Sequence, residues 1–182
     1  LHIHPTNLTL IEGNGVDLGV VTDFDGQTRS GLTPVDIGAD ADNFTGVDLA
    51  PPSIVYTPAA PTSCTPAPVT LIATITDAGN GVPTSGLGLP VLYWRINANP
   101  YAPVTATSLG GGQYQFTFGA GTVAGDVVSY YIVAQDNAGA PNVTSFPAGG
   151  AGGYTANPPA AATPPATPSS YTLPFALSGT YN

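Results

Sequence analysis

Aspartates near the N-terminus are the residues best suited to binding a metal ion or to catalysing hydrolysis. Asp23 and Asp25 are two positions apart, so on an extended strand both side chains would point to the same side. Asp36 and Asp40 follow beside a later glycine turn. Grouped carboxylate oxygens near such turns can bind Ca²⁺, which takes about six to eight oxygen ligands. One hypothesis is therefore a calcium site formed by these four aspartates.

The same aspartates allow two other interpretations. The segment Asp23-Phe-Asp-Gly lacks the downstream ligands and the glutamate of an EF-hand loop. The side chains can instead cap turns by accepting backbone hydrogen bonds, with Asp25 or Asp36 paired to Arg29. A hydrolytic carboxylate pair is the third interpretation, but two neighbouring carboxylates are not by themselves evidence of a glycosidase.

Other catalytic and cofactor chemistry is poorly represented. His2 and His4 alternate onto one face, but a structural zinc site needs about four ligands. No Gly-x-Ser-x-Gly elbow accompanies the serines, and residues 149–153 lack the strand-to-helix context of a phosphate loop. Cys64 is the single cysteine and has no partner for an internal disulfide. The sequence thus predicts a protein that is not an enzyme, with no cofactor unless calcium binds.

Composition excludes several classes of partner. The 182 residues include 23 Gly and 20 Pro, and the net charge is -9 with only two basic residues, Arg29 and Arg95. Two arginines cannot form the basic surface that nucleic acid or an anionic membrane requires. No apolar run approaches the roughly 18 residues of a membrane span. A low-charge, proline-rich chain of this kind is typical of β-structure outside the cell.

The region 51–145 is predicted to form short strands separated by turns. Strand-like runs recur at spacings of roughly 8–12 residues, which is the pattern of a β-sandwich, and no window has a useful helical period. The predicted strands are residues 53–57, 69–76, 91–96, 113–118 and 127–134. The last of these is the longest and is predicted to be central.

Alternation along these strands predicts which side chains form the core. One face of residues 69–76 is apolar and the other is mostly threonine, as expected for a sheet with one buried side. Arg95 is expected to point outward. The predicted core side chains are Val69, Leu71, Ala73, Ile75, Leu92, Trp94, Ile96, Tyr114, Phe116 and Phe118.

Residues 125–139, Gly-Asp-Val-Val-Ser-Tyr-Tyr-Ile-Val-Ala-Gln-Asp-Asn-Ala-Gly, resemble the penultimate strand of immunoglobulin-like and fibronectin-III-like modules of bacterial surface proteins. The stretch 51–181, including residues 83–95, is similar to a module of very large secreted proteins of the Bacteroidota. In that family the module often follows a right-handed parallel β-helix, whose last coil carries a motif like residues 23–29 and 36–40. Such proteins are mostly surface, adhesion or structural components.

The strand pattern, the shifts in composition and the resemblance together predict an all-β chain with four parts. Residues 1–48 would be an acidic segment that ends or caps a β-helix, and residues 51–145 an Ig-like or FnIII-like antiparallel β-sandwich. A Pro/Ala/Gly-rich arm, residues 146–170, would lead to a C-terminal strand within residues 171–182. Because the chain starts with neither Met nor a signal peptide, we expect a mature or processed protein or one segment of a longer protein.

The leading functional hypothesis is an extracellular structural protein without enzymatic activity. Two β-helix coils are fewer than the roughly three repeats that a solenoid needs, so another protein surface must cover their open end. The C-terminal strand either completes its own sandwich or adds to a neighbour's sheet edge. We therefore expect a module or subunit of a cell-surface fibre, filament or stalk, whose partners are copies of itself or the rest of a longer protein.

The alternative is an adhesion or carbohydrate-binding module on the C-terminal side of a polysaccharide-active β-helix protein. Its partners would be extracellular glycans, and Tyr101 is the candidate contact. Tyr93, Trp94 and Tyr114 are further candidates for stacking on sugars. The alternation of Trp94 and Tyr114 along their strands favours a place in the core instead.

Overall fold

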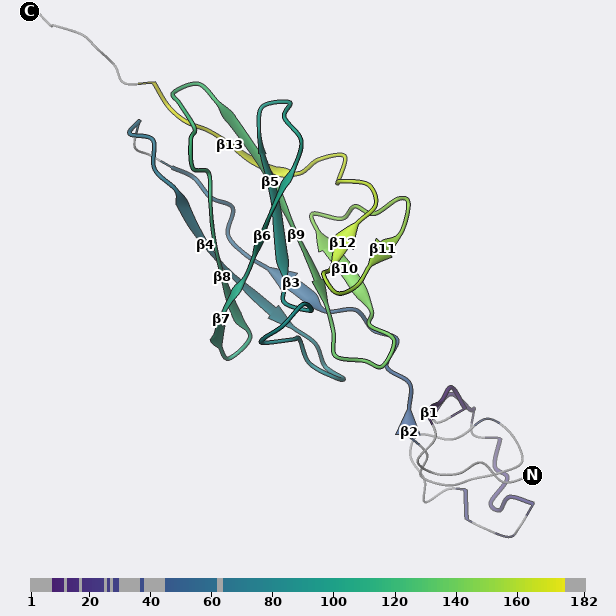
Figure 1. The fold of residues 1–182 in the computed structure, drawn as a ribbon. Helices are drawn as coiled ribbons and strands as arrows, with labels where there is room; N and C mark the ends of the chain where they lie inside the picture. Colours follow the sequence, from purple (N-terminus) through teal and green to yellow (C-terminus); the bar gives the residue numbers. More distant parts are fainter. Residues whose placement is uncertain are drawn as a thin grey trace, which may run out of the picture. The chain divides into compact units, whose positions relative to one another are not determined.

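The computed structural model describes residues 8–11, 13–16, 18–24, 26, 28–29, 37, 45–61 and 64–175. The chain divides into two compact units, Leu1–Leu49 and Ala50–Asn182. All regular structure in the described residues is β, which confirms the predicted all-β class (Figure 1). Across those residues, no helix has the length and apolar character needed to cross a membrane.

The N-terminal unit contains a short parallel strand pair. β1 (Leu8–Thr9) pairs with β2 (Thr45–Gly46), so segments far apart in the sequence lie side by side. Thr22 and Thr28 form an isolated antiparallel bridge. Much of the motif at residues 23–29 and 36–40 lies outside the described residues, and the β-helix coil stays a prediction.

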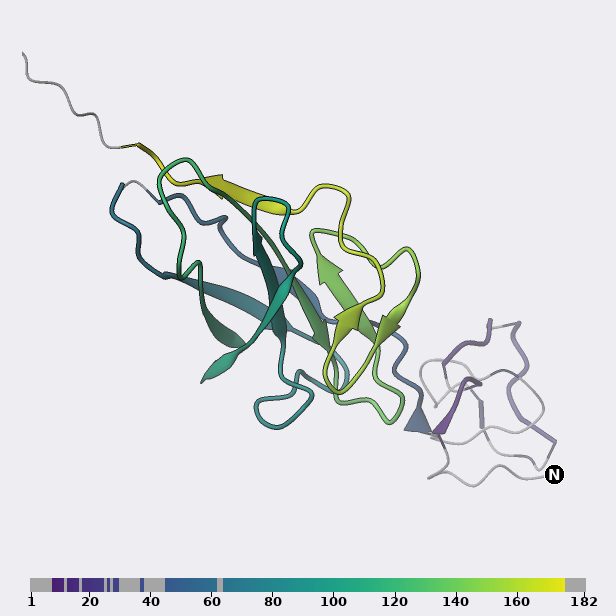
Figure 2. The same cartoon turned by 45° about the horizontal axis from the view of Figure 1, so that its top comes forward.

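The second unit contains two antiparallel sheets in a sandwich-like arrangement (Figures 1 and 2). The first sheet has the order β3-β4-β8-β7, with β3 (Ser53–Val55), β4 (Val69–Thr76), β8 (Gln113–Phe118) and β7 (Thr107–Gly110). The second has the order β10-β9-β5-β6, with β10 (Val143–Phe146), β9 (Val127–Gln135), β5 (Val91–Ile96) and β6 (Ala102–Thr105). β13 (Ser169–Thr172) also pairs with β9, at the first half of that strand, whereas β10 pairs with its second half.

The core lies between the sheets, and alternation along the strands builds it. On β4 the side chains of Leu71, Ala73 and Ile75 are buried, while the residues that alternate with them, three threonines and Ile72, are exposed. Tyr114, Phe116 and Phe118 of β8 and Leu92 of β5 are buried as predicted. Trp94 is partly buried and packs against this core, with its ring centroid 6.2 Å from that of Phe118. The predicted bounds of β4, β5 and β8 are confirmed, whereas β3 ends two residues earlier than expected.

β9 is buried on both faces. Its core-facing residues Tyr130 and Ile132 alternate with Tyr131 and Val133, which face the other way and yet are at most 2% exposed. The residues that follow β10 cover this second face, including a hairpin of β11 (Tyr154–Thr155) and β12 (Ala160–Ala161). The Pro/Ala/Gly-rich arm therefore lies against its own sandwich.

The C-terminal strand completes the same sheet. β13 pairs antiparallel with the first half of β9, from Ser169 opposite Tyr130 to Thr172 opposite Val127. Tyr171 and Leu173 then enter the sandwich, where they are 8% and 3% exposed. Of the two arrangements expected for this strand, the structure has the one within the same chain, and residues 176–182 lie outside the described part.

Replacing either of two isoleucines on β4 by alanine tests this arrangement. Ile75 is 1% exposed between the sheets, and Ile72 on the opposite face is 48% exposed. We expect Ile75→Ala to lower the free energy of unfolding by about 2–5 kcal/mol, because it leaves a cavity in the core. Ile72→Ala should cost no more than about 1 kcal/mol. Urea denaturation of both variants measures the difference, and equal losses would contradict the assignment of the two faces.

Candidate functional site

The aspartates predicted to bind calcium lie mostly outside the described residues. Asp23 is described, and its backbone carbonyl accepts a hydrogen bond from the N–H of Gly26 at 3.3 Å, which closes a turn. Asp25, Asp36 and Asp40 are not among the described residues, nor are the two N-terminal histidines. Calcium binding at Asp23, Asp25, Asp36 and Asp40 therefore stays a prediction.

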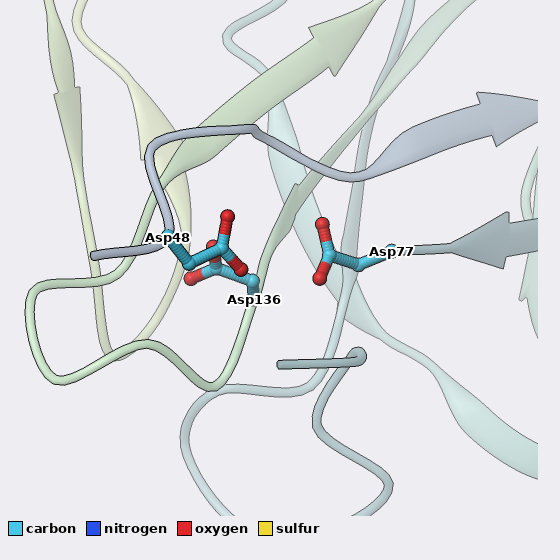
Figure 3. Close-up of side chains that lie close together, drawn as sticks. All are labelled: Asp48, Asp77 and Asp136. Atoms are coloured by element: carbon cyan, nitrogen blue, oxygen red, sulfur yellow. The ribbon is translucent and has the colours of Figure 1, made fainter. Parts of the chain in front are cut away.

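Within the sandwich, two other carboxylates approach one another at the ends of strands. Asp77 directly follows β4 and Asp136 directly follows β9, and their oxygens lie within 4.8 Å (Figure 3). Asp48, also labelled in Figure 3, belongs to the Leu1–Leu49 unit. Asp136 is fully buried, which requires its charge to be compensated by donors.

Backbone donors from the loops supply that compensation. Asp136 accepts hydrogen bonds from the N–H groups of Ala138 and Asn142 at 3.2 and 2.8 Å and from the Asn142 amide at 2.7 Å. One oxygen of Asp77 accepts from the N–H groups of Gly79 and Gly81, each at 3.0 Å. Carboxylate oxygens are the ligands that divalent cations such as Ca²⁺ prefer, but here they already organise two loops.

The two loops are also bonded to one another. The backbone N–H of Asn137 donates to the carbonyl of Gly81 at 3.0 Å, and its side-chain amide donates to the carbonyl of Asn80 at 3.2 Å. The β4–β5 and β9–β10 connections are thereby joined across the two sheets. The turn-forming residues that follow β4 (Asp77-Ala-Gly-Asn-Gly) and β9 (Asp136-Asn-Ala-Gly) are the signal in the sequence that could have indicated this contact.

A polar hollow of about 340 Å³ lies beside Asp136. Gln135 and Asn157 line it and bond reciprocally: the Gln135 amide donates to Asn157 Oδ1 at 3.0 Å, and the Asn157 N–H donates to Gln135 Oε1 at 2.9 Å. Gly88 forms another part of the wall, where an added Cβ would lie 2.9 Å from Pro83 and 3.1 Å from the Gln135 amide. The hollow is therefore shaped by the arm residue Asn157 as well as by the loops.

An aromatic cluster occupies the covered face of the second sheet. Tyr93 and Tyr131 are stacked with centroids 5.3 Å apart, and Tyr101 meets Tyr131 edge to face at 5.1 Å. The Arg95 guanidinium lies 4.6 Å from the centroid of the Tyr101 ring, within the range of a cation–π interaction. The hydroxyl of Tyr93 donates to the carbonyl of Pro159 at 3.1 Å, which ties the arm to the cluster.

Two polar atoms of this cluster are buried and make no hydrogen bond with any described residue. They are Nε of Arg95 and the hydroxyl oxygen of Tyr101. Both residues are partly exposed overall, whereas the two unpartnered atoms themselves are buried. Tyr101, the predicted glycan contact, therefore has one ring face under a guanidinium and a hydroxyl without a partner.

The other aromatic candidates have structural roles. Tyr114 is 2% exposed, and its hydroxyl donates to the carbonyls of Val82 and Pro83 at 3.2 and 3.1 Å. The core position that the alternation favoured for Tyr114 is confirmed, because the ring is buried between the sheets. Trp94 packs on Phe118, and Tyr93 is held by the arm.

No protein-family model matches the sequence, and no curated protein matches it significantly.

Tyrosine burial makes the stability of the protein sensitive to alkali. Burial, followed by the proximity of Tyr93 and Tyr101, raises the pKa of Tyr131 to about 12. An unfolded tyrosine has a pKa of about 10, so the neutral side chain stabilises the fold fully below that pH. This contribution is lost as the pH rises from about 10 through 12.

We expect the free energy of unfolding to fall over that range, and to fall less steeply in Tyr131→Phe, because phenylalanine cannot ionise. Chemical denaturation at several alkaline pH values measures the slope. Absorbance at the tyrosinate band identifies the ionising groups independently. Identical slopes in the two proteins would contradict the burial of a neutral Tyr131.

Proposed function

We propose that the chain is a non-enzymatic, extracellular structural module of a cell-surface fibre, filament or stalk. One observation carries the proposal: all three carboxylates of residues 50–182 hold loops in place. Asp77 and Asp136 do so as described above. Asp126 accepts from the Val123 N–H at 2.9 Å and from the Asn97 amide at 2.8 Å, and these bonds lower the pKa of its carboxyl group. The charged groups of the sandwich thus serve its architecture.

The order of the strands supports an immunoglobulin-like or fibronectin-III-like assignment. Such folds place strands A, B, E and D in one sheet and strands C, F and G in the other, and variable-type domains add a strand C′ next to C. Here the sheet order β3-β4-β8-β7 corresponds to A-B-E-D, and the order β10-β9-β5-β6 corresponds to G-F-C-C′. The parallel pairing of β1 with β2 supports the idea of a β-helix end, since consecutive coils of such a solenoid pair in parallel. A Bacteroidota-type surface protein combines the two in this order.

Electron microscopy of the native extracellular material tests the structural role. We expect regular fibres whose axial repeat, after image averaging, matches one copy of this chain or of the longer protein that contains it. Antibody labelling against the sandwich would identify the chain in the fibres. Preparations in which the labelled chain occurs only as isolated particles would contradict the fibre and favour a separate module.

A second candidate function is glycan binding, and the unpartnered Arg95 Nε and Tyr101 hydroxyl favour it. A sugar ring can stack on the exposed part of a tyrosine, and sugar hydroxyls would satisfy the two buried atoms if the Tyr101 side chain moves to admit them. We expect an immobilised glycan panel to bind the chain and Tyr101→Ala to bind about tenfold or more weakly. Tyr154→Ala, at a partly exposed tyrosine of the arm, is the matched control and should bind normally. Equal binding by all three proteins would place any glycan site elsewhere.

A further inference from the structure

One edge of β4 is only half covered. β3 pairs with the end of β4, where Ser53, Ile54 and Val55 lie opposite Thr76, Ile75 and Thr74. β3 ends at Val55, whereas β4 extends back to Val69. The first half of β4 is paired with β8 on one side, and no described strand lies on the other side.

The backbone direction shows which groups face that open side. The N–H of Ile75 donates to the carbonyl of Gly112, on the β8 side, at 2.8 Å. Because successive residues of a strand point their backbone groups to opposite sides, Thr70 and Ile72 direct theirs to the uncovered edge. Within the described part of the chain these groups make no backbone hydrogen bond on that side. Such an edge is a template for an added strand.

A groove runs along this edge. It has a volume of about 460 Å³, and its walls are the first residues of β4 and the segment that follows β3. The groove is lined by Thr57, Ala59, Ala60, Pro61, Val69, Thr70, Leu71 and Ile72. The lining has no charge and mostly small side chains, so an extended backbone can approach the strand closely.

Residues 176–182, Ala-Leu-Ser-Gly-Thr-Tyr-Asn, have the properties that this groove requires. They carry no charged side chain and no proline, so each residue can donate to a strand ladder. They follow Phe175, which lies against Gly125 at the end of the sandwich where β9 begins. β4 begins at the same end, because Gly119 is close to both Val69 and Tyr171.

The arrangement of residues 56–59 favours an occupant from a second copy. Tyr56 bonds through its hydroxyl to Ser169 at 2.9 Å, and the N–H of Ala59 donates to the Tyr130 hydroxyl at 2.7 Å. This segment therefore lies between β13 and the groove. To enter its own groove, the tail would have to reverse direction and cross that segment, whereas a neighbour's tail meets neither obstacle.

We propose that residues 176–182 of one copy add as a strand to the β4 edge at Thr70–Ile72 of a second copy. The inference rests on the proposed structural role and names the contact that joins the subunits. Each copy offers one tail and one groove. Head-to-tail repetition of such a contact gives an open filament when its rotation does not close.

A labelled peptide tests the contact directly. Fluorescence anisotropy would follow a dye-labelled peptide of residues 174–182 added to the full chain truncated after Phe175. We expect saturable binding, about tenfold or more weaker to the truncated Ala60→Asp chain, because the added charge would be buried without a partner in the groove. Ala120→Asp makes the same substitution at an exposed position outside the groove and should leave binding unchanged. Ile72→Pro, which removes a donor on the open side, should also weaken binding.

Sedimentation of the untruncated chain completes the test. We expect concentration-dependent oligomers that are lost on truncation and in Ala60→Asp but kept in Ala120→Asp. A monomeric full chain whose truncated form binds the peptide would overturn the proposal, because the tail would then fill its own groove. Absence of peptide binding would overturn it as well. Native fibres that persist unchanged with Ala60→Asp would refute this contact while leaving the structural role intact.

Discussion

The fold of the sandwich depends on the burial of β9. This strand is paired on one edge by β5 and on the other by β10 and β13, and both of its faces are covered. Strands covered on both faces are usual in parallel sheets beneath helices, whereas here an irregular arm provides the second cover. Because Tyr131 and Val133 would otherwise face water, the arm converts a two-layer sandwich into a partly three-layer one around this strand.

The carboxylates of the sandwich complement that burial, because they hold the loops between the strands in place. Asp77, Asp126 and Asp136 all follow or precede core strands, and they bond to loop backbone rather than to an arginine or lysine. A chain with two basic residues has few ion pairs to use, so backbone N–H groups are its main partners for carboxylates. Backbone N–H groups thereby hold the loops in place without arginine or lysine partners. Because these donors carry no charge, the chain keeps its net charge of -9.

Period-two alternation is a local property, which is why the sequence predicted β4 and β8 with their bounds and buried faces, and the bounds of β5. On β5 the alternation is less clear, since Val91 is buried and Ile96, predicted to be core, is only partly buried. The strands it missed, among them β6, β7 and β10, are short and contain Pro, Gly, Ser or Thr, so their partners rather than their own pattern define them. The cover over Tyr131 could not be predicted, because no alternation in the arm indicates which surface it contacts. For the site, Asp77 and Asp136 lie in sequences typical of turns, but their proximity depends on pairing between distant strands. The metal and glycan assignments at Asp23 and Tyr101 stay predictions.

The late position of β13 has a consequence for how the chain folds. Tyr171 packs its ring beside Phe118 and Tyr130 and reaches Gly119, where an added Cβ would lie only 2.6 Å from its hydroxyl. The residue that closes this end of the core is thus separated by some forty positions from the strand it pairs with. A chain that is still emerging, from a ribosome or through an export channel, cannot close its core until nearly all of the sandwich is available. Contacts of such long sequence separation form slowly, so we expect the sandwich to become compact only after its last strand is available.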